Sequence, residues 1–107
     1  MTTSVQLAGG VYQAVAAGQT AKALGRDGGK LNDVLEGILV VPATTSPGAV
    51  QIKDGADTAI TVFAGGASSV SNLVSFYLPL GGIKSKTGAW QITTGSNVSV
   101  VAAGRFT

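Results

Sequence analysis

The sequence lacks two residue types, because none of its 107 residues is a cysteine or a histidine. Without cysteine there is no disulfide framework and no thiolate metal site, so stability has to come from apolar packing and backbone pairing. Without histidine as well, the Ser-His-Asp and Cys-His catalytic arrangements and the usual zinc sites are excluded. Most enzyme classes are excluded in this way, and we predict a protein that is not an enzyme and uses no cofactor.

Charge is also scarce, since charged residues make up 11% of the chain, against about a quarter in an ordinary soluble domain. A weakly charged surface has little colloidal repulsion and little desolvation cost on contact, which suits a subunit of an assembly. The other interpretation is an ordinary secreted or cytosolic domain. The seven basic residues are scattered, and only Lys84 and Lys86 come close together. Nucleic-acid binding usually requires a basic cluster, so we expect no nucleic-acid partner.

Long hydrophobic runs are absent too. No stretch approaches the roughly 18 apolar residues of a membrane span, and residues 1–10 have no basic segment followed by an apolar one. We therefore expect neither membrane insertion nor secretion. The length predicts one domain over residues 1–107, because two halves would each have a marginal core.

What the sequence does contain is short β-like segments separated by 16 glycines. The clearest pair is Ala49–Lys53 and Thr58–Phe63, in which apolar and smaller or polar residues alternate. Between them, Asp54-Gly55 predicts a tight hairpin with a type I′ turn, in which both central residues have positive φ. We expect Ile60 and Val62 to point inward.

A second group of strands follows. Leu73–Leu80 is predicted to be a strand that ends at Gly81-Gly82, and Pro79 places it at an edge or bulge. Trp90–Thr93 alternates in the same way. The turn at 94–97 then leads into a last strand, Val98–Ala102.

The segment Leu31–Val41 is ambiguous. Its apolar residues fit helical spacing, but Gly37, three β-branched residues near its end and the following Pro42 favour a strand over Val34–Val41. Pro42–Gly48 is predicted to be a loop.

The first thirty residues are less clearly patterned. Val11–Ala17 and Thr20–Leu24 are weak strands or a short helix, and Gly25–Lys30 is a polar loop. Met1–Gly10 is either an extended arm that orders on a partner or a frayed end.

Residues that could carry chemistry are few. The five acids are Asp27, Asp33, Glu36, Asp54 and Asp57. We interpret Asp54 and Asp57 as solvated turn residues, since neither a calcium-loop nor a glycosidase pattern is present. Gly25–Lys30 lacks the Gly-Lys-Ser/Thr ending of a phosphate loop. Trp90 lies either in the core, which alternation favours, or on a sugar-binding platform. We assign no catalytic, cofactor-binding or metal-binding residue.

Three segments carry a resemblance to a known family. They are EGILVVPATTSPGAVQIKDG (36–55), TAITVFAGG (58–66) and FYLPLGGIKSKTGAWQITTGSNVSVVAAGRF (76–106). Together they resemble small virion proteins of tailed bacteriophages, in particular β-sandwich decoration or cement proteins. The resemblance implies binding to the major capsid protein on the outside of the capsid lattice, often as a trimer, and reinforcement of the shell. It implies no functional residue.

These observations lead to one expectation for the fold. We predict an all-β, single antiparallel β-sandwich, jelly-roll-like, with about eight short strands. The expected core is Val40, Val50, Ile52, Ile60, Val62, Phe76, Leu78, Trp90, Ile92, Val98 and Val100. We expect a virion location and a homo-oligomer. The alternative is a carbohydrate- or receptor-binding module of a phage tail, head fibre or tail fibre.

Overall fold

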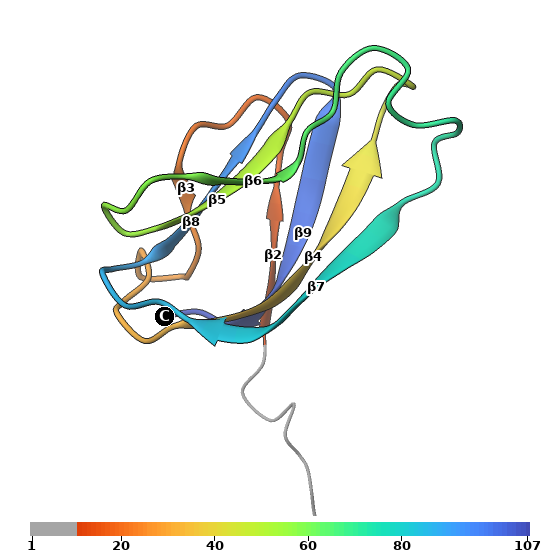
Figure 1. The fold of residues 1–107 in the computed structure, drawn as a ribbon. Coiled ribbons are helices and arrows are strands. Elements are labelled where there is room, and N and C mark those ends of the chain that lie inside the picture. Colours follow the sequence, from red (N-terminus) through yellow and green to blue (C-terminus); the bar gives the residue numbers. More distant parts are fainter. Residues whose placement is uncertain (1–10) are drawn as a thin grey trace, which may run out of the picture.

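The computed structural model describes residues 11–107, which form an all-β fold of two packed sheets (Figure 1). The predicted N-terminal arm, residues 1–10, lies outside the described residues. The strands are β2 (Val11–Val15), β3 (Lys22–Ala23), β4 (Val34–Pro42), β5 (Val50–Asp54), β6 (Ile60–Phe63), β7 (Phe76–Lys84), β8 (Trp90–Thr94) and β9 (Val98–Arg105).

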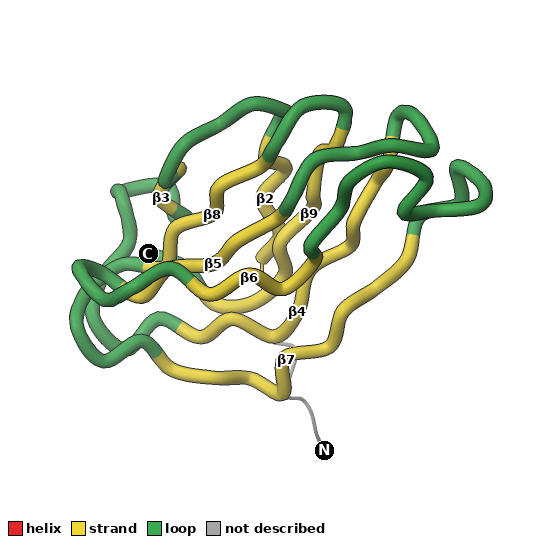
Figure 2. Tube along the Cα trace, turned by 45° about the horizontal axis from the view of Figure 1, so that its top comes forward, coloured by secondary structure: helices red, strands yellow, loops and turns green. Residues whose placement is uncertain are grey.

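The strand order is that of a jelly roll. One four-stranded sheet has the order β2-β9-β4-β7 and the other has the order β3-β8-β5-β6, with antiparallel neighbours throughout. The chain changes sheet at every connection except the one from β5 to β6. Figure 2 shows the two layers joined by loops at both ends of the sandwich. The predicted jelly-roll sandwich is therefore confirmed.

The core lies between the two sheets. It consists of Val15, Leu24, Leu35, Ile38, Val40, Val50, Ile52, Trp90, Ile92, Val98, Val100 and Ala102. Most of these residues alternate along their strands with less buried ones, as the pleat requires. The predicted core is largely confirmed, with Val62, Phe76 and Leu78 packed at its margin. Ile60 was wrongly placed in it, because β6 is an edge strand and leaves this side chain 54% exposed.

The ambiguous segment is a strand and not a helix. β4 runs from Val34 to Pro42 and pairs with both β7 and β9. Its register shifts between Leu35 and Gly37, which marks a β-bulge at Glu36. A side chain at Gly37 would clash, because its Cβ atom would lie 2.8 Å from the Leu78 backbone carbonyl oxygen and 2.1 Å from the Tyr77 hydroxyl. The two weak N-terminal segments are also strands, β2 and β3.

The predicted hairpin exists, but its turn is wrong. Gly55 has a positive φ of 55°, whereas Asp54 is still in β5 and does not have a positive φ. The Asp57 N–H donates to the Asp54 carbonyl at 2.9 Å, and β6 begins only at Ile60. The type I′ turn is lost because Asp54 still pairs with Trp90 on β8 and so keeps an extended backbone.

The strand β7 departs from the prediction at both ends. It begins at Phe76 and continues through Gly81 and Gly82 to Lys84. Both glycines have positive φ, 77° and 74°, and they let the strand bulge opposite Glu36 before pairing resumes at Ile83. Pro79 lies on an edge strand, as predicted.

Candidate functional site

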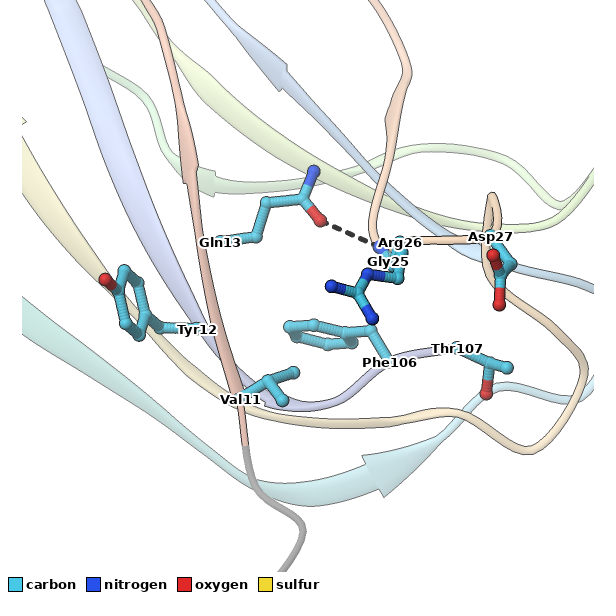
Figure 3. Close-up of a pocket in the computed structure, with 8 residues that line it drawn as sticks. All are labelled: Val11, Tyr12, Gln13, Gly25, Arg26, Asp27, Phe106 and Thr107. Atoms are coloured by element: carbon cyan, nitrogen blue, oxygen red, sulfur yellow. Dashed lines mark hydrogen bonds between the residues drawn. The ribbon is translucent and has the colours of Figure 1, made fainter.

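The outer face of the β2-β9-β4-β7 sheet is almost entirely apolar. Its outward residues alternate with the buried ones, and Figure 3 shows Tyr12 and Gln13 leaving β2 on opposite sides. We call this surface the apolar face. Its members are Tyr12, Ala14, Gly37, Leu39, Val41, Tyr77, Pro79, Val101 and Ala103, with Ser99 as the polar exception.

Strand register makes the apolar face continuous. Ala14 lies opposite Val101, which lies opposite Leu39, which lies opposite Tyr77. The next row, from β2 to β7, is Tyr12, Ala103, Gly37 and Pro79. Two rows of partners therefore cross all four strands without a charged or hydrogen-bonding side chain, except for the two tyrosine hydroxyls.

Charged residues are confined to one end of this sheet. Lys84 and Arg105 both lie opposite Val34. The Glu36 carboxylate lies beside Gly82, since a Cβ atom on Gly82 would be 3.1 Å from Glu36 Oε2. All three charged residues are exposed and sit at or near the bulge. They form a charged rim at one end of the apolar face.

The outer face of the second sheet is polar by contrast. Its outward residues on β5, β6 and β8 are Gln51, Lys53, Thr61, Gln91 and Thr93. The Gln51 amide donates to the Thr61 hydroxyl at 3.1 Å. This is the usual chemistry of a solvated sheet face, so the apolar face is the exception in this molecule.

Asp54 is buried and holds the loop before β8. Its carboxylate accepts hydrogen bonds from the backbone N–H groups of Lys86, at 2.9 Å, and Thr87, at 3.1 Å, and from the Thr87 hydroxyl at 3.2 Å. Burial raises the pKa of Asp54, but these hydrogen bonds and one from the Gly88 backbone outweigh it and lower the pKa below its ordinary value. The prediction of a solvated turn residue was wrong for Asp54.

Asp33 is the second buried carboxylate, and it fixes the C-terminus. It accepts hydrogen bonds from the Thr107 N–H at 3.0 Å, the Thr107 hydroxyl at 2.8 Å and the Lys30 N–H at 2.8 Å. Its backbone carbonyl accepts from the Trp90 indole N–H at 3.0 Å. Trp90 is therefore a core residue with a satisfied polar group, as alternation predicted.

An open pocket of about 580 Å³ lies beside the N-terminal end of β2, lined by Val11, Tyr12, Gln13, Gly25, Arg26, Asp27, Phe106 and Thr107 (Figure 3). Gln13 is committed to structure there, because its amide accepts from the Gly25 N–H at 2.8 Å and donates to the Ala23 carbonyl at 3.1 Å. Its ionisable groups, Arg26 and Asp27, are both exposed on the Gly25–Lys30 loop. The pocket presents no set of converging catalytic groups.

A second open pocket lies where β6 faces β7, and it includes Asp54, Asp57, Lys84 and Lys86. Across residues 11–107, every buried side-chain nitrogen or oxygen has a hydrogen-bond partner. The same residues contain no group of three acidic side chains placed to hold a metal. Among them there is also no helix long and apolar enough to cross a membrane.

Comparison of the chain with protein families, with curated proteins and with solved structures finds no match. Its strand order and its outward residues characterise the chain as a jelly-roll β-sandwich with one apolar and one polar outer face.

Proposed function

We propose that the protein is a structural virion subunit that binds the outer surface of a tailed-phage capsid as a decoration protein. The observation that carries the proposal is the apolar face. Its partner in this proposal is the major capsid protein, and its place is the capsid surface. The sequence resemblance described above supplies the phage context, and it implies a trimer as the assembled state.

The composition of the apolar face supports a partner. An antiparallel sheet normally turns its polar residues outward, and the second sheet of this molecule does so. A contiguous uncharged surface that spans four strands is typical of a protein interface and is an aggregation risk if left bare. Aliphatic residues such as Leu39 and Val101 favour a protein partner, since their burial requires no polar match.

Decoration of a shell also fits a contact of modest strength. A capsid presents many identical sites, so a subunit that contacts several of them at once gains effective concentration without a large interface. A jelly-roll sandwich can supply such a contact by the shape of its surface alone, and no catalytic step is needed.

The carbohydrate-binding alternative loses its main support. It depended on Trp90 as an exposed platform, but Trp90 is buried and its indole N–H is bonded to Asp33. Tyr12 and Tyr77 are exposed on the apolar face, yet their neighbours there are Ala, Gly, Pro, Leu and Val. Sugar recognition needs hydrogen-bonding groups beside the aromatic ring.

The proposal is tested by binding to capsids assembled without this protein. We expect the purified chain to co-sediment with such capsids from the phage that carries its gene, and Val101→Lys to weaken this binding at least about tenfold. Val101 is central in the apolar face, and an unpaired ammonium buried against a partner costs more than the roughly 1.4 kcal/mol that a tenfold change represents.

Gln91→Lys is the matched control, because it introduces the same charge at an outward position of the polar face. Both variants should keep the circular dichroism spectrum of the parent. If the chain does not bind capsids, it is not a decoration protein. If the Val101→Lys variant binds them as well as the parent does, the contact is not made through the apolar face.

A further inference from the structure

The edge of the β2-β9-β4-β7 sheet at β2 is open among the described residues. β2 pairs one-to-one with β9 from Val11 to Val15, and no described strand pairs with its other side. In an antiparallel pair, alternate residues turn their N–H and C=O groups away from the partner. Within residues 11–107, β2 therefore turns a row of backbone groups toward no other strand, on a segment, VYQAV, that contains no charge and no proline.

The other three sheet edges of the described fold are protected. β7 carries Pro79, a bulge at two glycines and a terminal lysine, which are three devices that prevent edge-to-edge pairing. β3 is two residues long. β6 is four residues long, and the register of its pairing with β5 is irregular. β2 alone is regular, uncharged and five residues long.

We propose that β2 pairs with β2 of a second copy, antiparallel and about a two-fold axis at Gln13. In this register Tyr12 lies opposite Ala14 of the second copy, so that a large side chain meets a small one, and Val11 lies opposite Val15. About a two-fold axis, each residue of β2 lies close to the same residue, or to a near neighbour of it, in the second copy. Because β2 carries no charge, this contact brings no like charges together.

This pairing has a consequence for the apolar face. The two-fold axis is perpendicular to the sheet, so the outward residues of both copies lie on the same side. The two four-stranded sheets become one, and Tyr12 and Ala14 of each copy lie at the centre of a doubled apolar face. The dimer differs from the trimer that the family resemblance implies, and it does not depend on capsid binding.

The contact is small, since it uses five residues of each copy. It falls well below the size of standard interfaces, and we expect a dissociation constant of about 0.1–1 mM in solution. The fraction of dimer should therefore rise with protein concentration. Sedimentation equilibrium of the full chain between about 10 µM and 1 mM measures this fraction.

Ala14→Lys tests the edge directly, because a lysine on an edge strand opposes pairing. Ala14 is exposed, and we expect the variant to weaken dimerisation at least about tenfold. Ala17→Lys is the control, since it makes the same change at an exposed residue beyond the end of β2. A monomer at 1 mM, a trimer, or a dimer that is equally strong in the Ala14→Lys variant would each overturn the proposal.

Cysteine pairing tests the register. The chain has no cysteine, so Tyr12→Cys and Ala14→Cys can be made as single variants in a clean background. On mild oxidation of an equimolar mixture, we expect the 12–14 disulfide between copies to exceed either homodisulfide several-fold, well above the statistical share. A statistical distribution would show that β2 does not pair about Gln13, whether or not the protein binds capsids.

Discussion

Replacement of Trp90 by alanine should lower the free energy of unfolding by about 3–5 kcal/mol, as large-to-small changes at buried aromatic residues do. Trp90 is only 3% exposed and lies between the sheets, opposite Asp54 on β5. For a domain of this size, the loss corresponds to a fall in Tm of roughly 15–30 °C. Urea unfolding followed by circular dichroism measures it, since the variant has no tryptophan to report fluorescence.

Trp90→Phe separates packing from hydrogen bonding. It keeps an aromatic ring in the core but removes the indole N–H that bonds to the Asp33 carbonyl. We expect it to cost about 0.5–1.5 kcal/mol beyond the loss of packing, because one buried hydrogen bond is lost while the Asp33 carbonyl still accepts from the Ser85 N–H at 2.9 Å. If Trp90→Ala cost less than about 1 kcal/mol, the side chain could not be the centre of the core.

Much of the fold could be predicted because alternation along the strands is clear. In β5 and β8, every second residue is buried, and glycine or proline marks the nearby turns. In β4, the proline after two valines and the mid-segment glycine outweighed the helical spacing. Tertiary pairing on both sides then gave that strand its full length.

The roles of the two buried aspartates could not be predicted. Asp54 meets Thr87 across 33 residues, and Asp33 meets Thr107 across 74. Short-range rules treat an Asp-Gly pair as a turn, and they contain no information about a distant backbone N–H that competes for the carboxylate. The type I′ turn failed because Asp54 pairs with Trp90 on β8 and stays extended, another contact between residues far apart in the sequence.

The apolar face has a signature in the amino-acid sequence. In β4 and β9, both the inward and the outward positions are mostly apolar, for example Val100 with Val101 and Val40 with Val41. A strand of that kind is normally buried on both sides. One side of each strand is covered by the second sheet, so the pattern already indicated that something covers the other.

Removal of the Asp54 carboxylate should be the second large destabilisation. Asp54→Ala leaves the N–H groups of Lys86 and Thr87 without their acceptor, and we expect a loss of about 2–4 kcal/mol. The loop between β7 and β8 should then exchange its amide hydrogens faster, which mass spectrometry detects. Asp57→Ala is the control, because Asp57 lies in the same turn and its carboxylate has no hydrogen bond to this loop.

The Asp54 carboxylate should also make the stability of the fold depend on pH in the acid range. Its pKa in the folded chain is lowered, so the charged form stabilises the fold above the unfolded pKa of about 3.9, and this stability is lost as the pH falls through the lower folded value. Asp54→Asn cannot titrate, so the stability difference between parent and variant should narrow as the pH falls from about 5 to 2. The other acids cancel in this difference. If the difference in unfolding free energy between parent and variant stayed constant or widened in acid, the charge of Asp54 would not be what holds the Lys86–Thr87 loop.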